Sequence, residues 1–244
     1  VIVDRDFATN RTIYMTYTAQ PESGTGSIGR VASAKLSADG ASLTDLKVLK
    51  EGVMIPRRVA QMNDGTLLVL TADILPGYRN AQDVGSPNGK VLRINTDGSI
   101  PQDNPFVGKD GHDASVYAMG FRDAQGIAFH PETGEPWIIE NHPRGGDELN
   151  VVRPGLNYGF PLISYGRDND GSLLNGGKTA QDGLEQPVHF WTPSVAFSGM
   201  AFYTGDKLKA WTGDVFMGGL SGQQLVRLDM QDGKVVGEEK LLRD

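Results

Sequence analysis

The feature that most constrains this chain is a recurring unit: a short apolar run, a turn that contains glycine, and a second short apolar run. Copies occupy residues 58–70, 126–139 and 199–216, at a spacing of about 70 residues. In the first copy, Asp64-Gly65 is typical of a type I′ hairpin turn, because both residues accept positive φ angles. Repeated hairpins with little helical periodicity predict an all-β chain.

Two further segments predict hairpins. One is a strand over 90–95 followed by Asp97-Gly98, and the other joins 224–230 to 234–242 through Asp232-Gly233. Hairpins repeated at this long interval are typical of β-propeller blades joined by long loops. The 244 residues hold about four blades, which we treat as one domain, 1–244. A closed four-bladed ring and a fragment of a larger ring both stay open, and the uncapped ends favour the fragment.

Composition excludes several classes of function. The net charge is −7 and no stripe of lysine and arginine is present, so nucleic acid is not expected as a partner. The chain has no cysteine, which excludes disulfides, zinc–thiolate sites and thiol catalysis. No apolar run approaches the roughly 20 residues of a membrane-spanning helix. We therefore expect no membrane insertion.

Two motifs resemble binding sites without the context that such sites need. Residues 24–29 match G-x-G-x-x-G, but Pro21 precedes them and a strand pattern follows, so we predict a hairpin loop and no nucleotide site. Residues 168–171 resemble the start of a calcium loop. If Gly171 is taken as the sixth position of that loop, Gly166 and Gly177 fall at its first and twelfth positions, where a calcium loop has acidic ligands. We therefore predict a solvated turn.

The segment 117–161 carries the most specific pattern. It contains Arg144-Gly145-Gly146-Asp147-Glu148 and, shortly after, Pro154-Gly155-Leu156-Asn157-Tyr158-Gly159. Both runs resemble the glucose/sorbosone dehydrogenase family, whose members are propellers that use pyrroloquinoline quinone (PQQ). Segments 6–11, 82–94 and 193–203 resemble other motifs of the same family. The resemblance therefore extends along nearly the whole chain.

The resemblance implies a six-bladed β-propeller of four-stranded antiparallel blades, of which this chain covers about four. A first blade before Val1 and a closing segment after Asp244 are then absent from this chain. The implied activity is PQQ-dependent oxidation of the C1 hydroxyl of aldose sugars to lactones, with calcium at the cofactor and an external electron acceptor. The implied location is the periplasm or the outside of the cell.

The family's functional positions carry over residue by residue. Asp73 matches the carboxylate that supports the catalytic base, and Arg122 matches the arginine that stabilises charge on the quinone. Pro143, with His142 before it, matches the backbone carbonyls that ligate calcium. Glu140 and the pair Asp147-Glu148 also match, with structural roles expected. The cofactor-binding positions are Arg122, Asp123, Gln125, Asn141, Leu220 and Ser221.

Several of these positions depart from the family pattern. Met54 falls where the family has its base histidine, and a thioether does not accept a proton at neutral pH. Asp123 replaces an asparagine and places a carboxylate near an anionic cofactor, and His142 replaces a glycine beside the calcium carbonyls. Ser221 falls where some members have a lysine for the cofactor.

Three functions stay open on these residues. The first is a sugar dehydrogenase in which Asp73 or a water replaces the missing base. The second is a degenerate propeller that binds a sugar, another small ligand or a partner protein without redox turnover. The third is a structural fragment with exposed sheet edges.

Overall fold

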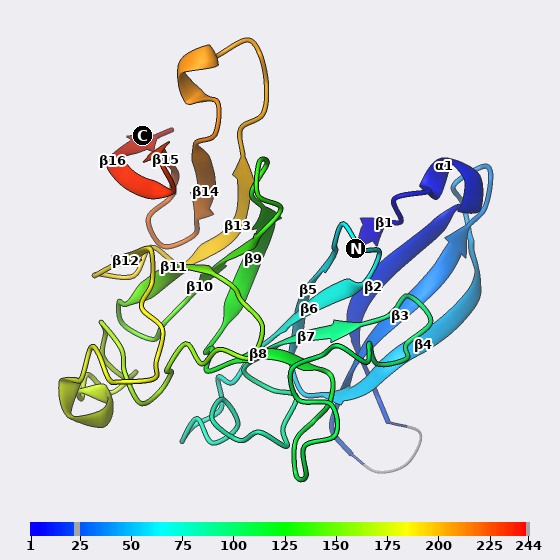
Figure 1. Cartoon of the computed structure of the whole chain (residues 1–244), viewed down its shortest axis with the longest axis horizontal. Helices are drawn as coiled ribbons and strands as arrows, with labels where there is room; N and C mark the ends of the chain where they lie inside the picture. Colours follow the sequence, from blue (N-terminus) through cyan, green and yellow to red (C-terminus); the bar gives the residue numbers. More distant parts are fainter. Residues whose placement is uncertain (22–24, 243–244) are drawn as a thin grey trace. The chain divides into compact units, whose positions relative to one another are not determined.

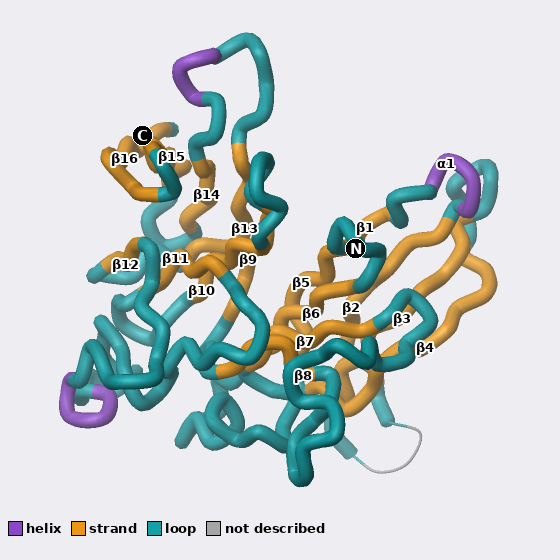
Figure 2. Tube along the Cα trace, viewed as in Figure 1, coloured by secondary structure: helices purple, strands orange, loops and turns teal. Residues whose placement is uncertain are grey.

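The computed structural model describes residues 1–21 and 25–242, and it confirms an all-β chain. The strands of this part form four antiparallel sheets of four strands each (Figure 1). Loops and three short helical turns make up most of the remainder (Figure 2). Two compact units, Val1–Met119 and Gly120–Asp244, hold two sheets each. We call them unit 1 and unit 2 and describe each by itself.

The first sheet of unit 1 follows chain order. Its strands are β1 (Ile2–Val3), β2 (Thr12–Ala19), β3 (Ile28–Leu36) and β4 (Leu43–Val53), with the short helix α1 (Phe7–Asn10) between the first two. Ala19 pairs with Ile28, so the segment with the G-x-G-x-x-G match joins two antiparallel strands, as predicted. Its first glycine, Gly24, lies outside the described residues.

The second sheet of unit 1 is also consecutive. Its strands are β5 (Pro56–Gln61), β6 (Leu67–Thr71), β7 (Lys90–Ile94) and β8 (Val116–Met119). The hairpin predicted at Asp64-Gly65 is confirmed. The hairpin predicted after β7 is wrong, because β7 pairs with β8 across a long loop that the turn at Asp97-Gly98 only begins. Every residue of β6 and β7 is buried, as expected for the middle strands of a packed sheet.

Unit 2 repeats this arrangement. The third sheet of the chain is the first of unit 2, and its strands are β9 (Ala124–Phe129), β10 (Pro136–Glu140), β11 (Asp147–Val151) and β12 (His189–Trp191). The fourth sheet of the chain has β13 (Phe197–Phe202), β14 (Val215–Gly219), β15 (Gln224–Gln231) and β16 (Lys234–Leu241). Two 3-10 turns, η1 (Leu174–Gly177) and η2 (Lys209–Trp211), lie in loops. The hairpin at Asp232-Gly233 is confirmed, and both residues have the positive φ of its turn type.

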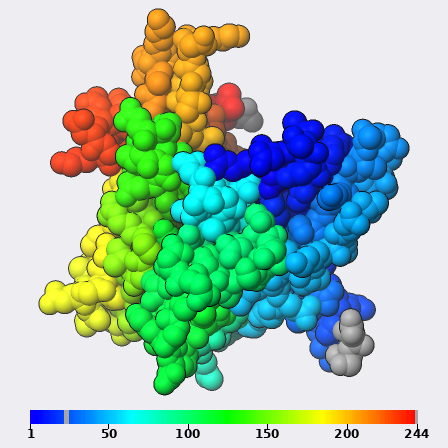
Figure 3. Space-filling view, turned by 45° about the vertical axis from the view of Figure 1, so that its right-hand side comes forward, coloured from blue at the N-terminus to red at the C-terminus, as the bar shows by residue number. Residues whose placement is uncertain are grey.

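Each unit has its own apolar core between its sheets. In unit 1 the core joins Tyr14 and Val31 of the first sheet to Val59, Leu67 and Ile94 of the second. The space-filling view shows the N-terminal residues, in dark blue, against the cyan part of the same unit (Figure 3). In unit 2 the core consists of Trp137, Ile139, Leu149, Trp191, Val195, Phe197, Val215, Met217, Val226 and Leu228. Packing of sheet faces therefore stabilises both units.

No helix in the described part of the chain has the length and apolar character to cross a membrane.

Candidate functional site

The two predicted positions of unit 1 lie at one end of its second sheet. Pro56 pairs with Thr71, and Met54 and Asp73 each lie two residues beyond this pair. The segments that carry the two side chains are therefore neighbours, although they are far apart in sequence. The structure brings these two predicted positions together.

The Asp73 carboxylate is almost fully buried and held by three N–H donors. Its exposed fraction is 1%. Oδ2 accepts the backbone N–H groups of Asn80 and Ala81, both at 2.8 Å, and Oδ1 accepts Nδ2 of Asn80 at 3.1 Å. A carboxylate offers about four acceptor sites. One site is therefore left for a ligand hydroxyl or a water.

Met54 presents an exposed thioether where the resemblance expects a base. Its exposed fraction is 37%. Its backbone N–H donates to Oδ1 of the buried Asn88 at 2.8 Å, which fixes the main chain at this point. The position is thus ordered through its backbone, and its side chain has no group that accepts a proton.

In unit 2, Arg122 precedes β9 and lies beside the end of β10. Its backbone N–H donates to Oε2 of Glu140 at 2.8 Å, and Nη1 donates to the carbonyl of Asn141 at 2.9 Å. The Nε–H of Arg122 is buried and has no hydrogen-bond partner among the described residues. A buried donor without a partner costs free energy, so this group fits an acceptor supplied by a ligand.

Asp123, Gln125 and Asn141 surround the same point. Nε2 of Gln125 donates to Oδ2 of Asp123 at 2.9 Å, and the backbone N–H of Asn141 donates to the carbonyl of Asp123 at 3.0 Å. Oδ1 of Asn141 is buried without a hydrogen-bond partner in the part of the chain that the structure describes. A donor on Arg122 and an acceptor on Asn141 are therefore both available at positions assigned to the cofactor.

Leu220 and Ser221 lie in the turn between β14 and β15, in the other sheet of unit 2. Leu220 is 77% exposed. The hydroxyl of Ser221 donates to the carbonyl of Ser194 at 3.1 Å. This hydroxyl supplies no charge of the kind that a lysine would offer to a cofactor carboxylate.

A cluster that the sequence did not reveal lies where β10 ends and β11 begins. Glu140 pairs with Glu148 across the two strands, and His142 follows two residues after Glu140. One ligand atom from each of these three side chains lies within 4.8 Å of the others, and all three residues are buried. Nε2 of His142 is 3.5 Å from Oε2 of Glu140, and Nδ1 is 3.0 Å from Oγ of Ser164. One imidazole and two carboxylates form a donor set that suits a divalent metal ion.

The charges of this cluster affect one another. Burial, together with the Glu140 carboxylate, raises the pKa of Glu148 to about 7, against the smaller opposing effect of His142. Burial alone would lower the pKa of His142, but the Glu140 and Glu148 carboxylates together outweigh burial and raise it. Protons or a cation are therefore needed to offset the buried carboxylates.

The imidazole of His142 is directed into this cluster. Its ring also packs edge-on against Phe160, with centroids 5.0 Å apart. Pro143 forms an isolated bridge with Gly145 immediately afterwards. The histidine that replaces the family's glycine is thus engaged with Glu140 and Ser164, and the calcium ligands expected at the His142 and Pro143 carbonyls stay a prediction.

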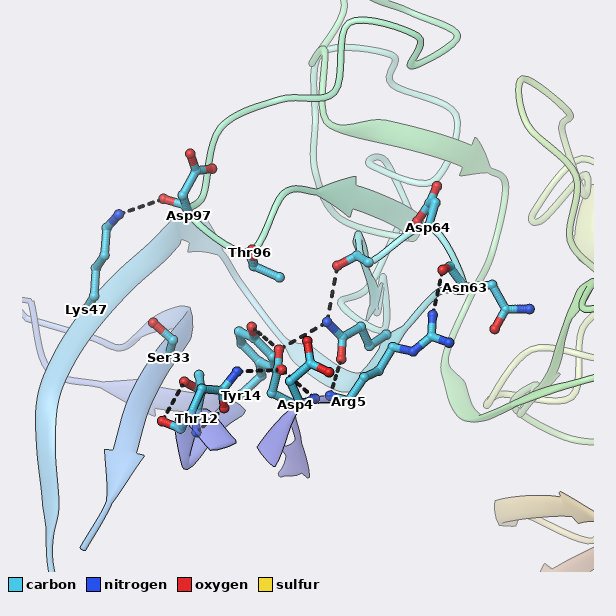
Figure 4. Close-up of a pocket in the computed structure, with 14 residues that line it drawn as sticks. Asp4, Arg5, Thr12, Tyr14, Ser33, Lys47, Asn63, Asp64, Thr96 and Asp97 are labelled. Carbon is cyan, nitrogen blue, oxygen red and sulfur yellow. Dashed lines mark hydrogen bonds between the residues drawn. The ribbon is translucent and has the colours of Figure 1, made fainter. Parts of the chain in front are cut away.

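Figure 4 shows a cavity of unit 1. Its lining includes Gln61, the last residue of β5, whereas Met54 precedes the first residue of that strand. The volume of the cavity is about 810 Å³, and the lining also includes the turn at 63–65 and the loop after β7. The buried Asp4 carboxylate in it accepts the hydroxyl of Tyr14 and Nδ2 of Asn10, both at 2.7 Å. These bonds lower the pKa of Asp4 against the opposing effect of burial. Asp4 thus joins the side chains of Asn10, Tyr14 and Gln61 in this cavity, which indicates a structural polar network.

Comparisons with known proteins agree with this architecture. A family model for glucose/sorbosone dehydrogenase matches residues 1–244. The chain is 33% identical to the aldose sugar dehydrogenase YliI of Escherichia coli (strain K12), over 100% of this chain and 67% of that protein. A Synechocystis protein is 34% identical, over 96% of this chain and 60% of its own length. The chain thus spans about two thirds of the length of these relatives.

Solved structures of sugar dehydrogenases also resemble this chain. A crystal structure of a glucose dehydrogenase superimposes with a TM-score of 0.92 at 35% identity, over 100% of this chain and 72% of that one. The PQQ-bound form of an aldose sugar dehydrogenase from Streptomyces coelicolor gives 0.75 at 25% identity, over 99% of this chain and 65% of that one. With the family model matched from the first residue to the last, this chain belongs to the glucose/sorbosone dehydrogenase family.

Proposed function

We propose that the protein is a PQQ-dependent oxidoreductase that oxidises the C1 hydroxyl of aldose sugars to lactones. The observation that carries this proposal is that two buried polar atoms, Nε of Arg122 and Oδ1 of Asn141, have no hydrogen-bond partner among the described residues. Both belong to positions that the family resemblance assigns to the cofactor. Relatives named as aldose sugar dehydrogenases, one of them with PQQ bound, support the same assignment.

The proposal extends to a fold that is larger than this chain. The four described sheets are four blades of a six-bladed propeller that forms one domain, 1–244 in this chain, with the remaining blades outside it. Solved relatives of which this chain covers 65–72% support this arrangement. The family resemblance then assigns Asp73 of unit 1 to the sugar and Arg122 of unit 2 to the cofactor.

The residues of this chain hold and orient the reactants. A bound PQQ would supply the oxidising chemistry, as the acceptor of a hydride from C1 of the sugar. The guanidinium of Arg122, anchored by the Asn141 carbonyl, offers its free Nε–H to a cofactor oxygen and stabilises negative charge there. Gln125 holds the Asp123 carboxylate by a hydrogen bond, which limits its repulsion of an anionic cofactor. The remaining acceptor site of Asp73 orients the sugar hydroxyl or a water that takes its proton.

The finer assignments follow from family membership. The carbonyls of His142 and Pro143 would ligate a calcium ion beside the cofactor, and calcium there would offset the charge that Asp123 adds. Leu220 and Ser221 would line the cofactor from the fourth sheet. Electrons would pass to an external acceptor, and the protein would work in the periplasm or outside the cell.

One observation favours a second candidate. Met54 occupies the position of the base, and its exposed thioether accepts no proton. Loss of a general base lowers rates by about 10²–10⁴-fold. The alternative is a propeller that binds a sugar, another small ligand or a partner protein at the same place without turnover.

A calorimetric titration tests the proposal. The purified protein is titrated with PQQ, with and without calcium, and aldoses are then screened with a dye as electron acceptor. Saturable, calcium-dependent binding near one equivalent with sugar-dependent dye reduction is the expected result. Binding without dye reduction would select the second candidate. Absence of binding, under conditions where an active family member binds PQQ, would refute the dehydrogenase.

A further inference from the structure

Lys90 is a buried lysine whose ammonium group has only main-chain partners among the described residues. It is the first residue of β7, and its exposed fraction is 0%. Its Nζ donates to the carbonyl oxygens of Asn80 at 2.5 Å, Asn88 at 2.9 Å and Ala81 at 3.0 Å. All three N–H bonds of the ammonium group are therefore used.

Two of these carbonyls belong to the residues that hold Asp73. The backbone N–H groups of Asn80 and Ala81 point to Oδ2 of Asp73, while their carbonyl groups point to Nζ of Lys90. The peptide unit that joins Asn80 to Ala81 thus has its oxygen at the cation and its N–H at the carboxylate. This orientation of a peptide dipole connects the two charges without direct contact between them.

The third carbonyl connects Lys90 to the position of the missing base. Asn88 accepts the ammonium N–H through its backbone oxygen and accepts the backbone N–H of Met54 through Oδ1, at 2.8 Å. Asn88 is itself buried. One ammonium group therefore holds the chain segments on both sides of the candidate sugar site in unit 1.

The charge of Lys90 is costly where it lies. Burial lowers its pKa to about 8, and the nearby carboxylates of Asp83, Asp73 and Asp113 oppose this effect through space. Asp113 is itself paired with Lys50 at 3.0 Å. An apolar side chain would fill this buried position without that cost. The retained charge therefore indicates a task beyond packing.

We propose that Lys90 is a positioning residue, whose ammonium group fixes the Asp73 carboxylate and the backbone of Met54 in the arrangement that receives the sugar hydroxyl. The inference rests on the proposed function for the identity of the ligand. It concerns residues of unit 1 alone, so the arrangement can be measured without a bound cofactor.

The test compares Lys90→Met with Lys47→Met by amide hydrogen exchange. Lys47 also donates to a main-chain carbonyl, that of Asp97 at 2.8 Å, but it is an exposed residue at the far end of the unit, so Lys47→Met controls for loss of a lysine-to-carbonyl bond elsewhere in the unit. In Lys90→Met the amides of Asn80, Ala81 and Met54 should exchange at least tenfold faster, while the β6 amides keep their rates. Lys47→Met should change none of them. Unchanged rates at Asn80 and Ala81, or an equal increase throughout β6, would overturn the inference.

Steady-state kinetics add a second readout. With PQQ and calcium present, Lys90→Met should lower kcat at least tenfold and leave the dissociation constant for PQQ within twofold of the wild-type value. A kcat equal to wild type would overturn the positioning role even if exchange increased. If the wild-type protein binds PQQ but shows no turnover, the dehydrogenase proposal fails and the exchange rates alone decide the role of Lys90.

Discussion

In the proposed dehydrogenase, the side chain at residue 54 decides whether the position that the family resemblance assigns to the base can accept the proton of the sugar hydroxyl. Met54→His places an imidazole at the exposed position beyond β4, where the family resemblance expects one. A positioned general base contributes about 10²–10⁴-fold to rate. We therefore expect kcat for aldose oxidation to rise at least about 100-fold, measured by dye reduction with PQQ and calcium present.

Met54→Gln is the control for this change. The amide matches methionine in length and adds polarity, but it accepts no proton near neutral pH. It should give no comparable increase. Equal kinetics for the two variants, with PQQ bound to both, would show that the base lies elsewhere or that no oxidation occurs.

The Glu148 carboxyl makes stability depend on pH. Its pKa is about 7 in the folded protein against an ordinary value of 4.5, so the folded state binds the proton more tightly than the unfolded state. Stability from this proton is full below about pH 4.5 and is lost as the pH rises to 7. The pKa of His142 is also raised, which acts in the same direction. The free energy of unfolding of unit 2 should thus fall by roughly 2–3 kcal/mol between pH 5 and pH 8.

Glu148→Gln removes this titration and should flatten the pH profile. The measurement is urea unfolding at several pH values, followed by tryptophan fluorescence, because Trp137, Trp191 and Trp211 all belong to unit 2. Glu132→Gln, at an exposed position in the β9–β10 turn, should keep the wild-type slope. Parallel profiles for wild type and Glu148→Gln would contradict the prediction.

At this scale the sequence identified positions better than environments. The family motifs assign roles to Asp73 and Arg122, which stay predictions, and the three donors around Asp73 come from a loop whose path no local pattern predicts. The His142 cluster was missed for a related reason. Its carboxylates meet because the β10–β11 register pairs Glu140 with Glu148, and register is a property of two strands together.

At the scale of elements, a glycine sets how closely two strands approach in unit 2. A Cβ added to Gly126 in β9 would lie 2.8 Å from Cγ2 of Ile139 and 3.1 Å from the backbone of Gly199 and Met200. Because backbone atoms cannot move aside as a flexible side chain can, Gly126→Ala should destabilise unit 2 by about 1–3 kcal/mol. Urea unfolding followed by tryptophan fluorescence measures this.

Gly218→Ala in β14 is the matched comparison. Its added Cβ would meet only Oγ of Ser198, at 4.0 Å. The change should therefore cost less than about 1 kcal/mol. If both alanine variants unfold at the same urea concentration, close approach of β9 to β13 is not what requires the glycine.

Local patterns predicted the tight hairpins well and one long connection badly. Asp64-Gly65 lies between β5 and β6, and Asp232-Gly233 lies between β15 and β16. Each turn joins two strands that pair with each other, so turn and partner are both local. At Asp97-Gly98 the turn does form, and the N–H of Gly98 donates to the carbonyl of Asn95. The partner strand, however, begins at Val116, and nothing near the turn identifies it.

At the scale of the whole molecule, the all-β class could be predicted because every sheet is made of neighbouring strands. The six-bladed ring and the single domain 1–244 stay predictions. A strand-and-turn pattern describes how one sheet forms, whereas ring closure depends on contacts between sheets that are far apart in sequence. Relatives that are longer than this chain support the ring, which stays a proposal.

The consecutive order of strands in each sheet also matters during synthesis. A strand that leaves the ribosome finds its partner already made, immediately before it in the chain, so little loop entropy opposes pairing. The longest delays within a sheet of the described residues are two: β7 waits through residues 95–115 for β8, and β11 waits through residues 152–188 for β12. During those intervals a three-stranded sheet has an unpaired edge. The edges of β7 and β11 are therefore where a chaperone acting on the nascent chain would have most to protect.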